Sequence, residues 1–141
     1  MSRRSLVRII DANANRAMEG LRVCGELVRF HLEVPKAFRR LRALRHATAR
    51  AVQQLPVSPA ERLRARQSER DFGKHAPSTS VDSLERLLVI NFQRAKEALR
   101  TLEECSRLIA PRHVRAFQHL RFQTYGVERE TILRVAALRH S

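Results

Sequence analysis

NANRAMEGLRVCGELVR, which runs from Asn13 to Arg29, returns later in the chain as NFQRAKEALRTLEECSR, from Asn91 to Arg107. The two copies share an asparagine, three arginines, an alanine, two glutamates and a leucine at equivalent positions, 78 residues apart. Downstream, AFRRLR at 37–42 matches AFQHLR at 116–121, with the offset one residue larger. An internal repeat is stronger evidence for the architecture of a chain than any single motif. The sequence therefore predicts two similar two-helix units.

Two polar residues interrupt the apolar face of each copy. At about 100° per residue, Asn13 and Arg16 fall among the apolar residues of the first copy, and Asn91 and Arg94 do so in the second. A buried guanidinium without a partner is costly, so it needs either a carboxylate or an anionic ligand. The repeated asparagine and arginine therefore indicate a binding role.

A ladder of surface ion pairs is the alternative interpretation of the charged residues. Opposite charges recur three or four residues apart in the first copy, and such pairs contribute about 0.2–0.5 kcal/mol each. This alternative stays open for Arg22, Glu26 and Arg29, whose positions face away from the apolar side. It does not explain an asparagine on that side, or the same asparagine and arginine in both copies.

The whole chain has helical periodicity, and no alternating pattern of strands is found. Helices are expected at 5–33, 35–54, 59–66, 81–109 and 112–140. Ser58 is expected to cap the short third helix, Thr79 or Ser80 the fourth, and Tyr125-Gly126 is expected to interrupt the fifth. We predict an all-α fold, a helical bundle of two long-helix hairpins related by a pseudo-twofold axis. The single domain, 1–141, would comprise repeat 1 at about 5–55, a crossover at 56–80 and repeat 2 at about 81–140.

The composition is strongly basic, with 28 Lys and Arg against 14 Asp and Glu and a formal net charge of +14. Such an excess indicates anionic partners, although the preference for arginine over lysine explains part of it without reference to function. Nucleic-acid binding is disfavoured because the chain has no Trp, one Tyr and six Phe, most of them on apolar stripes. No membrane-spanning run is present, and Cys24 and Cys105 are expected to be buried, reduced thiols of a cytoplasmic protein.

The longest irregular stretch, 67–80, carries Asp71, Gly73 and Lys74. Long loops in compact domains often have a function, and Asp-x-Gly can place a carboxylate beside backbone amides on a tight turn. An ordinary surface turn is an equal alternative. Zinc-type spacings such as CxxC and HExxH are absent from the sequence.

Four segments carry a family resemblance: RIIDANANRAMEGLRV at 8–23, LRH at 44–46, RxxERDFG at 66–73 and NFQRAKEALRTLEE at 91–104. They resemble the helical hydroxymethylpyrimidine phosphate kinases of thiamine biosynthesis, a domain often fused ahead of a thiamine phosphate synthase barrel. The resemblance implies an enzyme that uses ATP and Mg²⁺ to phosphorylate hydroxymethylpyrimidine phosphate. Its product is the diphosphate that thiamine phosphate synthase consumes.

The site residues follow from this resemblance, position by position. The carboxylates that match the family pattern are Asp11, Glu19, Asp71 and Glu97. Phosphoryl transfer needs a metal held by carboxylates and a group that orients the attacking oxygen, so we expect Asp71 to be the catalytic residue and Mg²⁺ ligand, with Glu19 and Glu97 as the next candidates. The expected substrate and phosphate ligands are Asn13, Arg16, Arg22, Arg45, His46, Gly73, Asn91, Arg94 and Arg100. Phosphoryl transfer needs such positive groups around the phosphates, and the asparagines would contact the pyrimidine edge or a phosphate.

Two other function classes fit the same sequence. A non-catalytic helical module that docks on thiamine phosphate synthase would explain the fused relatives, and a basic nucleic-acid-binding protein would explain the charge. For the kinase the expected partner is a small phosphorylated pyrimidine, and for the docking module it is thiamine phosphate synthase. A homodimer is left open.

Overall fold

The computed structural model describes residues 2–67, 70–74 and 80–139, and these residues contain helices and no strand. The long helices are α1 (Arg3–Leu27), α2 (Pro35–Gln54), α4 (Leu84–Ile109) and α5 (Val114–Arg139), and α3 (Pro59–Ala65) is short. A π-helical turn, η1 (Val28–Leu32), joins α1 to α2, and a 3-10 turn, η3 (Pro111–His113), leads into α5. The predicted all-α fold is confirmed.

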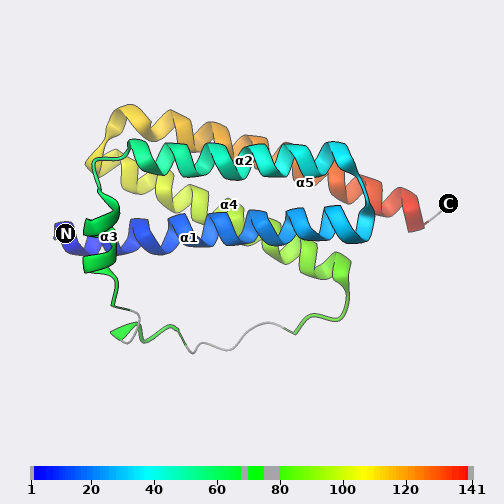
Figure 1. Ribbon diagram of the computed structural model, residues 1–141, viewed down its shortest axis with the longest axis horizontal. Coiled ribbons are helices and arrows are strands. Elements are labelled where there is room, and N and C mark those ends of the chain that lie inside the picture. The colour runs from blue at the N-terminus through cyan, green and yellow to red at the C-terminus, as the bar shows by residue number, and fades with distance from the viewer. Residues whose placement is uncertain (1, 68–69, 75–79, 140–141) are drawn as a thin grey trace.

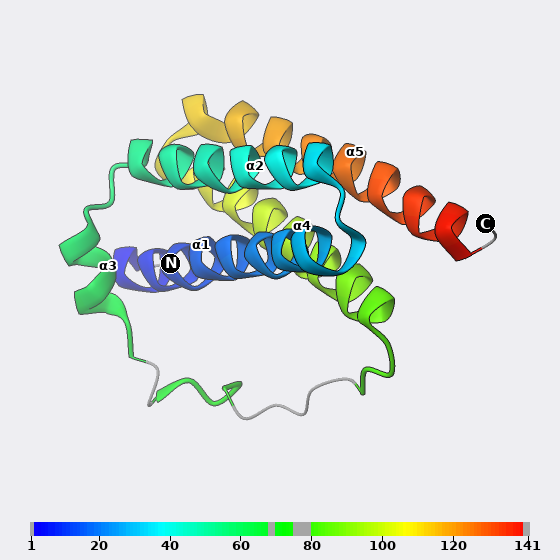
Figure 2. The same cartoon turned by 45° about the vertical axis from the view of Figure 1, so that its right-hand side comes forward.

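Two helical hairpins, α1–α2 and α4–α5, form the bundle (Figure 1). The most extensive contact joins α1 to α4, and these two helices cross in the turned view of Figure 2. The second helices of the hairpins, α2 and α5, pack together on the other side, where Arg40 pairs with Glu130. The two copies of the repeated motif therefore lie on the two helices that contact each other most.

Hydroxyl caps decide where several helices begin. The Ser58 hydroxyl accepts a hydrogen bond from the Glu61 N–H at 3.1 Å, as predicted for α3. At α4 the prediction was wrong: Ser83 has an extended backbone, and its hydroxyl accepts the Arg86 N–H at 3.0 Å, so the helix begins at Leu84. Ser80 precedes the helix, and Thr79 lies outside the described residues.

Two other expected boundaries differ. The first α-helix ends at Leu27, and the π-helical turn follows it. Glu33, whose backbone lies in the left-handed region at φ 55°, ends that turn. The fifth helix continues through Tyr125 and Gly126. A helical glycine costs about 1 kcal/mol relative to alanine, but buried Thr124 and Val127 on either side pack this segment against the core.

The core lies along the facing sides of the four long helices. Its largest fully buried side chains include Ile10, Leu21, Leu41, Leu88, Phe92, Leu99, Leu102 and Phe117. The Cys24 and Cys105 thiols are free and buried, as predicted. Burial raises the pKa of both thiols, so neither is a reactive thiolate. None of the described helices is long and apolar enough to cross a bilayer.

Candidate functional site: a pocket between the two motif copies

A pocket of about 610 Å³ lies between α1 and α4. Five pairs of equivalent repeat positions line it: Asn13 and Asn91, Arg16 and Arg94, Glu19 and Glu97, Gly20 and Ala98, and Val23 and Thr101. Every pair is 78 residues apart, which is the offset between the motif copies. We call this site the paired pocket. Its size is within the range of about 300–1,000 Å³ that is usual for small-molecule sites.

The two asparagines form the buried part of the paired pocket. Asn13 and Asn91 are 7% and 5% exposed, and each donates its side-chain N–H to the carbonyl four residues earlier, both at 2.9 Å. A carbonyl only accepts hydrogen bonds, so the orientation of both amides is set by these bonds. Neither side-chain oxygen accepts a hydrogen bond from the described residues. Both oxygens are thus available as acceptors for a ligand.

The charged members of the paired pocket are exposed. The apolar stripe predicted buried guanidinium groups for Arg16 and Arg94, and this was wrong, because the positions face the open pocket rather than the core. No ion pair or hydrogen bond of either side chain is found within the described ranges. Glu97 accepts a hydrogen bond from Gln93 Nε2 at 2.9 Å, whereas Glu19 has no such partner among the described residues. Two guanidinium groups therefore remain free to bind an anion.

Four of the predicted ligands lie away from the paired pocket: Arg22, Arg45, His46 and Arg100. Arg22 and Arg45 line a different pocket, between α1 and α2, and His46 is exposed on α2. The Arg100 guanidinium pairs with Glu103 at 3.1 Å and with Glu104 at 3.3 Å. The ion-pair interpretation holds for Arg22 as well, which contacts Glu26 at 3.0 Å. The predicted arginine ligands therefore lie in different places, with Arg16 and Arg94 in the paired pocket, Arg22 and Arg45 in the pocket between α1 and α2, and Arg100 in ion pairs.

Asp71 and Gly73 form a local turn. The Asp71 carboxylate accepts the backbone N–H of Gly73 at 2.9 Å, and Lys74 N–H bonds back to the Asp71 carbonyl. Neither residue lines the paired pocket. No group of three or more His, Cys, Asp or Glu suited to a metal occurs in the described part of the chain. The turn thus matches the surface-turn alternative, and it offers Mg²⁺ a single carboxylate.

Asp11 has a structural partnership that the sequence did not reveal. Its carboxylate is buried and accepts hydrogen bonds from Arg62 Nε at 2.9 Å and from Arg66 Nε at 2.8 Å. Burial raises the pKa of the Asp11 carboxyl, but the hydrogen bonds from Arg66 and Arg62 outweigh it and hold that pKa below its usual value. These partners are 51 and 55 residues away. Asp11 therefore fastens α3 and the residue after it to α1.

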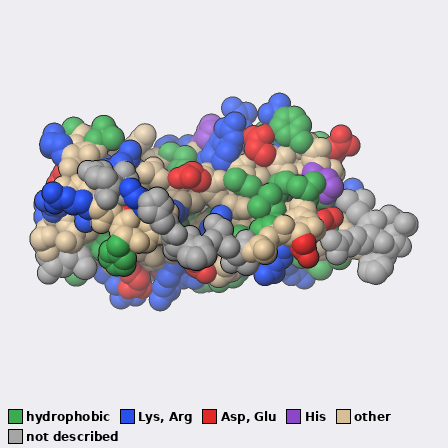
Figure 3. Space-filling model, turned by 90° about the horizontal axis from the view of Figure 1, so that it is seen from below, with side chains coloured by type: hydrophobic (Ala, Val, Ile, Leu, Met, Phe, Trp, Pro, Cys, Tyr) green, Lys and Arg blue, Asp and Glu red, His purple; other side chains and the backbone are tan. Residues whose placement is uncertain are grey.

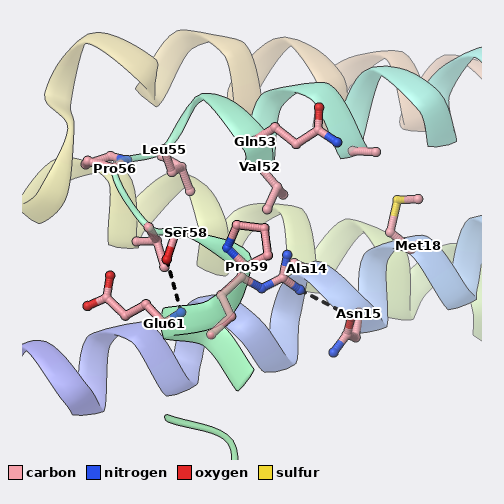
Figure 4. A pocket seen from close by; sticks show the side chains of 13 residues that line it. Ala14, Asn15, Met18, Val52, Gln53, Leu55, Pro56, Ser58, Pro59 and Glu61 are labelled. Atoms are coloured by element: carbon pink, nitrogen blue, oxygen red, sulfur yellow. Dashed lines mark hydrogen bonds between the residues drawn. The ribbon is translucent and has the colours of Figure 1, made fainter. Parts of the chain in front are cut away.

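A larger pocket, of about 700 Å³, opens where α3 is held against α1 and α2. In Figure 4 Met18, Val52 and Gln53 lie around it, and a hydrogen bond of 3.3 Å ties Asn15 to Arg62. None of the residues predicted for the site lines this pocket, and its one arginine is engaged by Asp11. It lacks the free cationic groups that a phosphorylated ligand requires.

The surface charge is mixed on the face seen in Figure 3, where basic side chains are interspersed with acidic and hydrophobic ones. The paired pocket has the same character on a smaller scale, with two arginines and two glutamates. Nucleic-acid binding stays the disfavoured alternative and a homodimer stays untested, and the high net charge alone does not identify the site.

Curated relatives of this chain are named thiamine-phosphate synthase. The proteins of Nostoc punctiforme and Gloeobacter violaceus are 35% and 38% identical, over 86% and 87% of this chain and 34% and 35% of their own lengths. The protein of Rhodopirellula baltica is 33% identical over 96% of this chain and 36% of its own length. The chain thus spans about one third of these relatives. No solved structure shows a significant match.

These names correct the enzyme assignment made from the sequence. Thiamine-phosphate synthase is a different enzyme from hydroxymethylpyrimidine phosphate kinase, so the assignment of the chain to that kinase is wrong by the names of its relatives. The thiamine pathway, which the resemblance also implied, is supported by the same names.

The family comparison covers most of the chain. The model of the ThiD2 family matches residues 8–130, which include both motif copies, α3 and the Asp71 turn. Both halves of the paired pocket lie inside the matched range. The chain therefore belongs to the ThiD2 family.

Proposed function

We propose that the chain binds a phosphorylated aminopyrimidine of thiamine biosynthesis in the paired pocket. The observation that carries this proposal is the pair Arg16 and Arg94, which come from equivalent positions and have no carboxylate partner among the described residues. Guanidinium groups bind phosphate oxygens through two parallel hydrogen bonds, and such charge-assisted bonds are roughly twice as strong as neutral ones. The phosphate of the ligand is the group that Arg16 and Arg94 receive.

The asparagines suit the ring of the same ligand. Their free side-chain oxygens, fixed by the bonds to the carbonyls of Ile9 and Leu87, accept hydrogen bonds from an exocyclic amino group. Because both amides are buried, water competes weakly for these oxygens, and a ligand without the amino group would leave them unsatisfied. The proposal therefore predicts discrimination between the aminopyrimidine and its deaminated analogue.

Glu19 and Glu97 complete the paired pocket. Mg²⁺ is commonly held by one or two carboxylates, with substrate phosphates and water supplying its other oxygen ligands. In this proposal a magnesium ion that accompanies the phosphate is bound at Glu19 and Glu97, rather than at Asp71, whose carboxylate caps a turn outside the pocket.

A second candidate function is docking on thiamine phosphate synthase. The relatives named thiamine-phosphate synthase are about three times as long as the matched region, so most of each relative lies beyond it. In those proteins a part similar to this chain and a larger remainder are thus joined in one polypeptide. We infer that this chain acts beside such an enzyme, as a separate protein or as part of one.

Isothermal titration with hydroxymethylpyrimidine phosphate tests the binding proposal. We expect binding to the wild type, and weaker binding to Arg16→Ala and Arg94→Ala by about tenfold or more, since a hydrogen bond to a charged group is worth about 1.5–3 kcal/mol. Arg115→Ala, an exposed arginine of α5 outside the paired pocket, is the matched control. Equal affinity in all four proteins would overturn the proposal.

Two parallel measurements separate the alternatives. A mixture with ATP and Mg²⁺, followed for ADP, measures directly whether phosphoryl transfer accompanies binding. Size-exclusion chromatography with a separately produced thiamine phosphate synthase measures docking. Co-elution that survives Arg16→Ala would show a docking surface independent of the paired pocket, while separate elution would remove the docking function for the isolated chain.

A further inference from the structure

The pocket that Arg22 and Arg45 line, on another face of α1, has four arginines in its wall. It measures about 360 Å³ and lies between α1 and α2. Its charged lining consists of Arg22, Arg29, Arg42, Arg45 and Glu26, and Gly25 lies in its wall. We call it the arginine pocket. It shares no lining residue with the paired pocket.

The second repeat shows what occupies the corresponding place there. At the offset of 78, Gly25 corresponds to Glu103 and Arg22 to Arg100, and at the downstream offset of 79, Arg42 corresponds to Arg121. The Glu103 side chain is 3% exposed and pairs with Arg100 at 3.1 Å and with Arg121 at 3.2 Å. In repeat 2, therefore, a carboxylate of the chain itself lies between the two arginines.

The first repeat has the arginines without that carboxylate. A Cβ added at Gly25 would meet nothing within 4 Å, so the space that Glu103 uses in repeat 2 is open in repeat 1. No ion pair of Arg42 is found in the described part of the chain. The pair Arg22–Glu26, at 3.0 Å, is no substitute, because repeat 2 has the same pair in Arg100–Glu104 in addition to Glu103.

Arg45 increases the difference in charge between the arginine pocket and the corresponding place in repeat 2. Its counterpart at the offset of 79 is Thr124, a fully buried residue whose hydroxyl donates to the Leu120 carbonyl at 2.8 Å. Burial, together with the neighbouring charges of Arg22 and Arg42, lowers the pKa of Arg45. The arginine pocket thus has four arginines and one carboxylate, where repeat 2 has three arginines and two carboxylates at the matching positions.

We infer that the arginine pocket binds a phosphoryl group, whose oxygens take the place that the Glu103 carboxylate takes in repeat 2. A carboxylate and a phosphate both accept paired hydrogen bonds from guanidinium groups, so the same arrangement of Arg22 and Arg42 serves either anion. The site is separate from the one that carries the proposed function. The ligand is either inorganic phosphate or the phosphate end of a metabolite.

Two substitutions at one position test this inference. Gly25→Glu supplies the carboxylate of repeat 2, and Gly25→Ala is its matched control, because alanine also raises helix propensity, by slightly more than glutamate, and adds no charge. Thermal unfolding is followed with inorganic phosphate against sodium chloride at equal ionic strength. We expect phosphate to raise the Tm of the wild type and of Gly25→Ala. Gly25→Glu should have the highest Tm without phosphate and a smaller response to it.

An equal phosphate response in Gly25→Glu and Gly25→Ala would overturn the inference, as would no response in the wild type. Circular dichroism establishes that each variant is folded. If Gly25→Glu does not fold, Arg45→Thr, which introduces the residue of repeat 2, gives the decision, and we expect phosphate binding about tenfold or more weaker. Unchanged affinity in Arg45→Thr would overturn the inference too.

The Arg94→Ala background separates the two pockets and the two sources of the phosphoryl group. A Gly25-dependent phosphate response that persists in Arg94→Ala supports the arginine pocket even if the paired pocket fails its own test. A response that depends on Arg94 and not on Gly25 overturns it. In the same background, tighter binding of hydroxymethylpyrimidine phosphate than of inorganic phosphate identifies a metabolite, and equal or weaker binding identifies the free ion.

Discussion

Gly20 of α1 lies directly against the backbone of Asn91 on α4: a Cβ built on Gly20 would come within 2.9 Å of the Asn91 carbonyl oxygen. The same Cβ would lie 3.3 Å from the Cβ of Ala95. A backbone oxygen in a helix cannot rotate aside as a side chain can. The missing side chain of Gly20 therefore sets how closely α1 and α4 approach at the paired pocket.

Gly20→Ala is expected to destabilise the protein although alanine is the better helix former. Overpacking typically costs about 1–3 kcal/mol, which exceeds the gain of about 1 kcal/mol from helix propensity. Gly25→Ala, where the new Cβ meets no atom within 4 Å, should instead be stabilised by up to about 1 kcal/mol. Urea unfolding measures both. Equal stabilisation in the two variants would show that the contact at Asn91 imposes no constraint.

Glu103→Gln is expected to lower the free energy of unfolding by about 1–3 kcal/mol, because it leaves the guanidinium of Arg121, a side chain that is 13% exposed, without a charged partner. Glu104→Gln is the neighbouring control. The Glu104 side chain is 45% exposed, and exposed pairs contribute about 0–1 kcal/mol. Chemical denaturation of both variants at neutral pH gives the comparison. A loss in Glu103→Gln no greater than in Glu104→Gln would contradict the buried network.

Asp11→Asn is expected to make the stability of the protein less dependent on pH in the acid range. The pKa of Asp11 is lower in the folded protein than its ordinary value of 3.8. Its contribution to stability is therefore fully present above that value and is lost as the pH falls through the lower, folded pKa. Tm measured from pH 6 downward should fall less steeply in Asp11→Asn than in the wild type. Parallel curves would show that another carboxyl group carries the acid sensitivity.

Arg16→Ala and Arg94→Ala are expected to leave stability almost unchanged while weakening ligand binding. Both side chains are exposed and without partners in the described part of the chain, and surface substitutions of this kind usually stay within about 0.5 kcal/mol. Thermal unfolding without ligand, compared with the titrations described above, separates the two effects. A large loss of Tm without ligand would identify these arginines as structural.

The repeat made much of the fold predictable. The 78-residue offset places Asn13 opposite Asn91 once α1 and α4 are known to pack together, and the helical periodicity alone predicts the four long helices. What an isolated helix cannot show is whether a position on its apolar side faces a packed neighbour or a hollow. Arg16 falls on that side by angle, yet it is exposed because the paired pocket opens there.

Tertiary partners account for the other differences. Arg22 and Arg100 occupy equivalent positions in the two repeats. Repeat 2 has Glu103, which forms an ion pair with Arg100, whereas repeat 1 has Gly25 at that position, so Arg22 borders a pocket instead. The partnership of Asp11 with Arg62 spans 51 residues, and no local spacing predicts it. The Gly25 and Glu103 difference was visible in the aligned copies. Its meaning required knowing that α2 brings Arg42 to the same place.

The paired pocket has a consequence for how a ligand is oriented. In a dimer of two identical two-helix chains, such a pocket would be symmetric about its axis, and an unsymmetrical molecule would bind equally well in either direction. Joining the halves in one polypeptide lets them diverge, and two of the five lining pairs have done so, Gly20 with Ala98 and Val23 with Thr101. At these positions α4 has the Ala98 methyl group where α1 has no side chain, and the Thr101 hydroxyl where α1 has a second methyl group on Val23. A molecule with a phosphate at one end and a ring at the other would consequently meet different side chains in its two directions.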